Sequence, residues 1–154
     1  MEYLSDCRFV HKDIASRNVL LEPNLSVKLA SLSLSRDIYA SEYVQATSGL
    51  LLPLRWTSPE AWLEDEYSTK SDVWSFGCFL NEVFSGAEIP FSEMTNDQVK
   101  KSYNSNKIQL NATDKMPNEL KMVAHQCWSS SPKDRPDFRQ IVTMFASLGL
   151  DTSL

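Results

Sequence analysis

Residues 71–85, which read SDVWSFGCFLNEVFS, decide the fold expected for this chain of 154 residues. Their apolar side chains occupy nearly every side of a helix instead of one stripe, and a helix of that kind is buried at the centre of a domain. Ser71 or a neighbour is expected to cap its start, with Asp72 in the first turn facing the helix dipole. Gly86 stands where a helix C-cap is expected.

Short strands are expected before this helix and further helices after it. Residues 19–21 and 26–30 are apolar runs separated by turn residues, whereas residues 31–58 show little periodicity and indicate a long functional loop. Residues 95–98 (TNDQ) fit a capping box that opens a helix through about residue 104. Pro136 is expected in the first turn of the last helix. One face of each late helix is apolar, comprising Leu120, Val123, Ala124, Cys127 and Trp128, and then Phe138, Ile141, Val142, Phe145 and Ala146. The predicted fold is mainly α, with a small β element near the start.

Composition excludes several classes of protein. A hydrophobic content of 42% is ordinary for a soluble domain, and 154 residues are enough for one domain with a real core. The net charge of −5, without a cluster of Lys and Arg, argues against nucleic acid as a partner. No apolar run reaches the length of a membrane span, and no signal pattern opens the chain. Three widely spaced cysteines indicate reduced, buried thiols in a cytosolic protein.

Four motifs follow one another along the chain. They read HKDIASRN (11–18), PLRWTSPE (53–60), STKSDVWSFG (68–77) and CWSSSPKDRP (127–136). In this order and spacing they resemble the C-terminal lobe of a protein tyrosine kinase across residues 1–148. The resemblance implies this lobe's mainly α fold and the following parts: a catalytic loop at 11–18, an activation segment at 31–60, a helical subdomain at 61–148 and a tail at 149–154.

The resemblance gives the catalytic loop a chemistry. Phosphoryl transfer needs an aligned nucleophile and a divalent metal held by oxygen ligands. Asp13 matches the residue that accepts the substrate hydroxyl proton, and Asn18 matches a ligand of the second Mg²⁺. Arg17 matches the arginine that tyrosine kinases carry just before that asparagine. The alternative is that Asp13 and Asn18 only hydrogen-bond their own backbone.

Two further matches are structural, and two tryptophans are expected in the core. Glu60 and Arg135 correspond to a buried ion pair that ties the end of the activation segment to the late helices. Asp72 corresponds to the carboxylate that holds the backbone of the catalytic loop. Trp74 and Trp128 are expected to be core aromatics.

The metal-binding triplet of active kinases is altered in this sequence. Ser31 stands at the position of the metal-binding Asp, and Leu32 and Ser33 replace the Phe and Gly that follow it. A neutral hydroxyl cannot replace a carboxylate that links Mg²⁺ to the phosphates. Leu32 can still fill an apolar position against His11. The resemblance therefore implies a degenerate cofactor position in a retained fold.

Two further features concern phosphorylation of the activation segment. Lys12 replaces the arginine that clamps a phosphorylated activation loop, and lysine lacks the bidentate fork. Tyr39 and Tyr43 resemble the activation-loop tyrosines of receptor kinases, and another tyrosine kinase is an expected partner for them. The alternative is that both are unmodified, exposed loop tyrosines.

Within the tyrosine branch, HKD with an altered metal triplet resembles the colon-carcinoma-kinase/off-track group of receptor pseudokinases, with the Ror receptors next. This resemblance implies Wnt receptors and cytoplasmic adaptors as partners, on the cytoplasmic side of the plasma membrane for a receptor and in the cytoplasm otherwise. None of the four glycines lies in a G-x-G pattern, and the chain starts about ten residues before the catalytic loop. We expect a fragment that lacks the N-lobe and binds no cofactor by itself; ATP with Mg²⁺ requires an upstream N-lobe.

Three functions stay open at this point. The leading hypothesis is a pseudokinase C-lobe that signals by protein contacts. The second is an active tyrosine kinase that uses Asn18 as its intact metal ligand. The third is a C-lobe that acts alone and sequesters the partners of a kinase.

Overall fold

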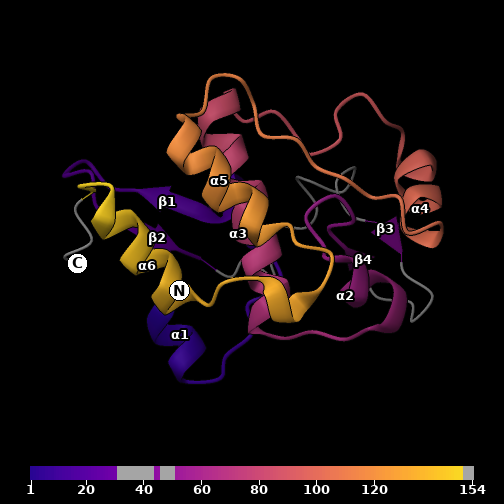
Figure 1. Ribbon diagram of the computed structural model, residues 1–154, viewed down its shortest axis with the longest axis horizontal. Coiled ribbons are helices and arrows are strands. Elements are labelled where there is room, and N and C mark those ends of the chain that lie inside the picture. Colours follow the sequence, from indigo (N-terminus) through magenta and orange to yellow (C-terminus); the bar gives the residue numbers. More distant parts are fainter. Residues whose placement is uncertain (31–43, 46–50, 151–154) are drawn as a thin grey trace.

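The computed structural model describes residues 1–30, 44–45 and 51–150. Figure 1 shows helices gathered around one central helix, with a small antiparallel hairpin to one side. The helices are α1 (Glu2–Asp6), α2 (Pro59–Glu64), α3 (Thr69–Ser85), α4 (Asn96–Asn104), α5 (Asn118–Cys127) and α6 (Phe138–Ser147), with 3₁₀ turns η1 (Ser16–Asn18) and η3 (Pro132–Asp134). The strands are β1 (Val19–Leu21), β2 (Val27–Leu29), β3 (Val44–Gln45) and β4 (Leu51–Leu52). The predicted mainly α fold is confirmed.

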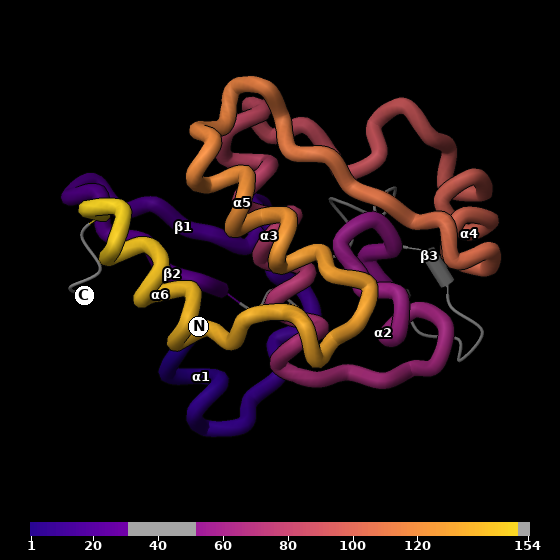
Figure 2. Tube along the Cα trace, viewed as in Figure 1, coloured from indigo at the N-terminus to yellow at the C-terminus, as the bar shows by residue number. Residues whose placement is uncertain are grey.

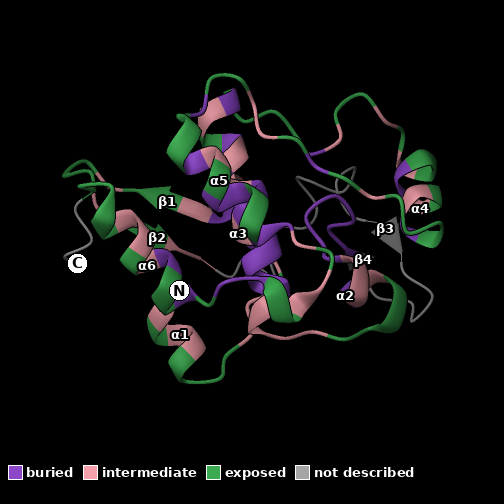
Figure 3. Ribbon diagram, viewed as in Figure 1, coloured by how far each residue is buried: buried purple, intermediate pink, exposed green. Residues whose placement is uncertain are grey.

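Helix α3 is the buried axis of the molecule. Its middle is the most continuously buried segment in Figure 3, and it lies against α5. The helix starts two residues earlier than expected because Ser68, not Ser71, is the N-cap; Ser71 closes the capping box from the third helical position. Gly86 ends the helix with φ of 86°, a conformation that glycine adopts without strain. The predicted C-cap is confirmed.

Close packing joins α3 to the residues that follow α5. A Cβ atom built on Gly77 would lie 2.6 Å from Trp128 Nε1 and 2.9 Å from Cys127 Cβ, so only glycine fits there without displacement. Trp74 and Trp128 are both buried in the same cluster of apolar residues. The expectation that these two tryptophans are core aromatics is confirmed.

The two strand pairs are antiparallel. Val19 pairs with Leu29 in β1–β2, as the apolar runs predicted, and Val44 pairs with Leu52 in β3–β4. The second pair lies inside the segment expected to be a long loop, where two residues per strand are too few to leave a periodic pattern. The β1–β2 hairpin leaves Leu21 and Leu25 largely exposed.

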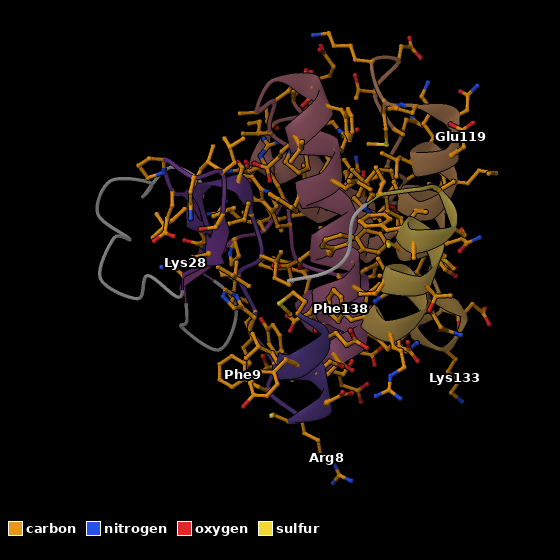
Figure 4. All side chains as sticks on the ribbon, turned by 90° about the vertical axis from the view of Figure 1, so that its left-hand side faces the viewer. Arg8, Phe9, Lys28, Glu119, Lys133 and Phe138 are labelled. Atoms are coloured by element: carbon orange, nitrogen blue, oxygen red, sulfur yellow. The ribbon has the colours of Figure 1, made fainter. Side chains whose placement is uncertain are left out.

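The last helices complete the core around α3. Phe138 is buried at the start of α6 and points into the interior in Figure 4, whereas Arg8 and Lys133 project outward. Asp137 caps α6 through a capping box with Gln140. Pro136 therefore lies before the cap, and its predicted place in the first turn is wrong because the aspartate offers a better N-cap. Helix α1 lies against α6, as the tube in Figure 2 shows.

No helix within the described ranges is long and apolar enough to span a bilayer.

Candidate functional site

The backbone of the catalytic loop is hydrogen-bonded to helix α3 through one carboxylate, that of Asp72. Asp72 accepts hydrogen bonds from the backbone N–H groups of His11, at 2.7 Å, and Lys12, at 2.9 Å. Its side chain is 1% exposed. Burial raises the pKa of Asp72, and the two N–H groups offset only part of that rise. The structure therefore places Asp72 against the loop backbone, where the resemblance implied it.

Asp13, Arg17 and Asn18 come together at the other end of this loop. Arg17 forms an ion pair with a carboxylate oxygen of Asp13, and Asn18 Nδ2 donates to the Asp13 carbonyl at 2.7 Å. The Arg17 guanidinium also lies over the Trp56 ring, 4.2 Å from its centroid. The last three residues of the loop form the η1 turn, which carries both Arg17 and Asn18. Asn18 is buried, while the Asp13 side chain keeps a quarter of its surface exposed.

Glu82 is a second anchor that the sequence motifs did not reveal. Its carboxylate accepts from Ser16 N at 3.1 Å, from Ser16 Oγ at 2.6 Å and from Trp56 Nε1 at 2.9 Å. Glu82 is 3% exposed. An acid within an otherwise apolar, buried helix needs a hydrogen-bonding partner, and this was the sequence signal from which its role could have been inferred. Glu82 therefore joins α3, the catalytic loop and the segment before α2.

A bidentate ion pair connects α2 to the residues before α6. Arg135 Nη1 and Nη2 donate to the two carboxylate oxygens of Glu60, at 2.6 and 2.8 Å. The Arg135 side chain is fully buried, and it also donates to the carbonyls of Ser129 and Lys70. Burial raises the pKa of Glu60, but the hydrogen bonds and the charge of Arg135 together hold it below its usual range. The pairing that the resemblance implied is present in the structure.

Arg55 is another buried cation that the motifs did not single out. Its guanidinium donates to the carbonyls of Pro90, at 2.9 Å, and of Phe91 and Met94, each at 2.6 Å. Its Nε donates to Asn96 Oδ1 at 3.0 Å. Burial lowers the pKa of Arg55. Arg55 therefore fastens the loop between α3 and α4 to the segment before α2.

Four predicted positions, Ser31, Leu32, Tyr39 and Tyr43, lie outside the described residues. The predicted contact between Leu32 and His11 is among these untested expectations. Lys12 is described and has a φ of 70°, in the left-handed region that strains a residue other than glycine. Its Nζ lies 4.3 Å from the centroid of the Tyr67 ring.

Within the described residues, the predicted phosphoryl-transfer positions that come together are Asp13 and Asn18, which offer a carboxylate and one carboxamide oxygen. The metal position predicted at Ser31 lies outside the described residues. Within the described ranges no group of three or more His, Cys, Asp or Glu side chains is arranged to hold a metal ion.

Comparison with known proteins agrees with this geometry. The family model of protein tyrosine and serine/threonine kinases matches residues 1–145. Inactive tyrosine-protein kinase 7 of Gallus gallus is 46% identical over 149 residues, which cover 97% of this chain and 14% of that protein. The protein of the same name from Homo sapiens is 43% identical over 152 residues, covering 99% of this chain and 14% of that protein. The insulin-like growth factor 1 receptor of Xenopus laevis is 38% identical over 143 residues, covering 93% and 10%.

These relatives confirm the resemblance to the colon-carcinoma-kinase group, whereas the likeness to the Ror receptors stays a prediction. The chain spans about a seventh of the length of the first two relatives. The matched residues include the catalytic loop, the anchors on α3 and the Glu60–Arg135 pair. The chain belongs to the family of protein tyrosine and serine/threonine kinases.

Proposed function

We propose that this chain is the C-lobe of a receptor tyrosine kinase homologue that transfers no phosphate and signals by protein contacts. The observation that carries the proposal is the sequence Ser31-Leu32-Ser33 at the position of the metal-binding triplet. Without a carboxylate there, the charge of the β- and γ-phosphates is not neutralised, which is the main task of a kinase site. The name of the relatives, inactive tyrosine-protein kinase 7, supports the same reading.

The retained scaffold supports a role in binding. The backbone of the lobe is held in a defined shape by Asp72, Glu82 and the Glu60–Arg135 pair. None of these interactions requires phosphate transfer. In this proposal the lobe spans residues 1–148, with the catalytic loop at 11–18, the activation segment at 31–60 and a tail at 149–154. A rigid surface of this kind reduces the entropy lost when a partner binds.

The finer parts of the proposal rest on resemblance. Wnt receptors and cytoplasmic adaptors are the proposed partners, at the cytoplasmic face of the plasma membrane. Tyr39 and Tyr43 are proposed acceptors for another tyrosine kinase, because phosphorylation would add charge and acceptor oxygens to the activation segment.

A phosphotransfer assay tests the loss of chemistry. The longest natural protein that carries this chain is incubated with ATP, Mg²⁺ or Mn²⁺ and a tyrosine peptide, beside its Asp13→Asn variant. We expect the two proteins to give the same background signal, since Asp13 has no metal-bound phosphate to serve. Turnover that Asp13→Asn abolishes would instead establish the rival function, an active kinase using Asn18 alone. That rival also predicts autophosphorylation at Tyr39 or Tyr43.

A rescue experiment tests the contact role. Cells that lack the protein are given the wild type or the Asp13→Asn variant, and signalling is compared at equal expression. Equal rescue is expected, because contacts do not use the Asp13 carboxylate as a base. A variant that fails to rescue while remaining folded would contradict the proposal.

A further inference from the structure

We infer that a groove beside α3, between the segments that precede and follow α4, is a docking site for a basic peptide segment with an apolar anchor. This acidic groove has a volume of about 590 Å³ and is lined by residues 88–94 on one side and 109–114 on the other, with Asn81 between them. The residues on these two sides belong to the connecting segments before and after α4, which can be followed in Figures 1 and 2. The inference deepens the proposed contact role and rests on it.

The groove offers apolar surface to a ligand. Leu110 is buried, and Phe91 and Ala112 are partly buried and pack on the core cluster around α3; all three line the groove. Ile89, which is 36% exposed, and Met94, which is half-buried, line it as well. The volume lies in the range of ligand sites in proteins, so it has room for an apolar side chain together with its flanking residues.

Both sides of the groove are fixed from beneath. Arg55 donates to the carbonyls of Pro90, Phe91 and Met94, so the first side cannot move without breaking hydrogen bonds to a guanidinium, one of them buried. On the opposite side, Thr113 N donates to Asn81 Oδ1 of α3 at 2.8 Å. The groove is therefore formed before any partner arrives, which lowers the entropic cost of binding.

The charge of the lining selects the partner. Glu88, Glu93 and Asp114 line the groove, and none of its lining residues is a lysine or an arginine. Lys121 lies 3.6 Å from Asp114 and offsets that carboxylate, which leaves the charge concentrated on the side of Glu88 and Glu93. Electrostatic complementarity favours a cationic segment and disfavours an acidic or phosphorylated one.

The occupant is thus an extended segment of another protein with Arg or Lys on both sides of a Leu or Phe. The apolar side chain enters the groove above Leu110, and the flanking cations face Glu88 and Glu93. A second copy of this chain fits less well because its net charge of −5 repels the groove.

Fluorescence anisotropy with the full chain tests this assignment. The probe is a fluorescein-labelled peptide, GRRLFRRG, compared with GQQLFQQG and GRRSSRRG at matched ionic strength. We expect GRRLFRRG to bind, and each altered peptide to bind at least about fivefold more weakly, because one lacks the charge and the other the anchor. Salt is expected to weaken binding of the first peptide.

Matched variants locate the binding site. Glu88→Gln with Glu93→Gln should weaken GRRLFRRG by about fivefold or more, whereas Glu64→Gln with Glu66→Gln removes two exposed acids outside the groove and should leave affinity within about twofold. All four positions are exposed, so folding is retained.

Three outcomes would overturn the proposal. Equal weakening of peptide binding by the two pairs of substitutions would show that only the overall charge of the protein matters. Absence of GRRLFRRG binding would overturn the groove assignment too. The proposed contact role is tested separately, because the Asp13→Asn rescue experiment does not depend on the groove. A dimer that the Glu88/Glu93 pair dissolves would assign the groove to a second copy and overturn it likewise.

Discussion

Arg135 has no exposed side-chain surface and binds both oxygens of Glu60, whose side chain is 12% exposed. We expect Arg135→Ala to lower the free energy of unfolding by about 3–5 kcal/mol, because the Glu60 carboxylate is left buried without its partner. Urea unfolding followed by circular dichroism measures the change. Arg139→Ala is the control, since Arg139 is 70% exposed and its ion pairs with Glu2 and Asp6 are open to water. A similar loss in both variants would contradict the argument.

The same pair predicts a dependence on pH. Arg135 holds the pKa of Glu60 below its ordinary value of 4.5, so the stability that Glu60 contributes is present above about pH 4.5. It is lost as the pH falls through the lower pKa of the folded state. We expect the stability gap between the wild type and Glu60→Gln to shrink between about pH 6 and pH 3.

Two comparisons isolate this effect. The raised pKa of Asp72 has the opposite sign, because a buried acid favours folding when protonated, but it is present in both proteins and cancels. Glu64→Gln, at an exposed position of α2, should show a gap that is small at every pH. A gap for Glu60→Gln that stayed constant in acid would show that Arg135 does not shift the carboxylate.

At the scale of elements, the catalytic loop depends on the first turn of α3. Asp72→Asn replaces one carboxylate oxygen by an amide that cannot accept, so one of the N–H groups of His11 and Lys12 loses its partner. The expected loss is about 2–3 kcal/mol, since hydrogen bonds to a charged group are the stronger kind. Amide hydrogen exchange at His11 and Lys12 should accelerate. Asp97→Asn on α4, where the side chain is 95% exposed, should leave both amides unchanged.

The sequence predicted the long helices and the β1–β2 hairpin, but not α2 or the β3–β4 pair. Helix α3 was predicted within two residues because seventeen residues give a clear pattern, and its start was misplaced because Ser68 and Ser71 both fit a cap. Helix α2 was not predicted, since PEAWLE is too short for a periodic signal. The site residues in the motifs came from family resemblance. Glu82 and Arg55 were missed because their roles arise from contacts between distant segments. Glu82 lies 66 residues from its partner Ser16, and Arg55 lies 35 residues from its partner Pro90.

For the whole molecule, the two largest groups of buried apolar residues share α3. Trp74 and Cys78 belong to the first group and Val73 to the second, so neither group can form without this helix. We expect one cooperative unfolding transition, with the same urea midpoint by far-ultraviolet circular dichroism and by tryptophan fluorescence. Trp56, Trp74 and Trp128 are buried and report on tertiary packing. Midpoints that separate would show that the groups unfold independently.

The two carboxylates that α3 extends toward the catalytic loop, Asp72 and Glu82, accept hydrogen bonds from its backbone. These hydrogen bonds bear on how the sequence can change in evolution. In a saturation-mutagenesis library scored for protein abundance, Asp72 and Glu82 should tolerate the fewest replacements, while Asp13, whose side chain is partly open to solvent, should tolerate more than either. A family of proteins under no selection for catalysis can then lose its reactive residues one by one and still keep the surface that its partners bind.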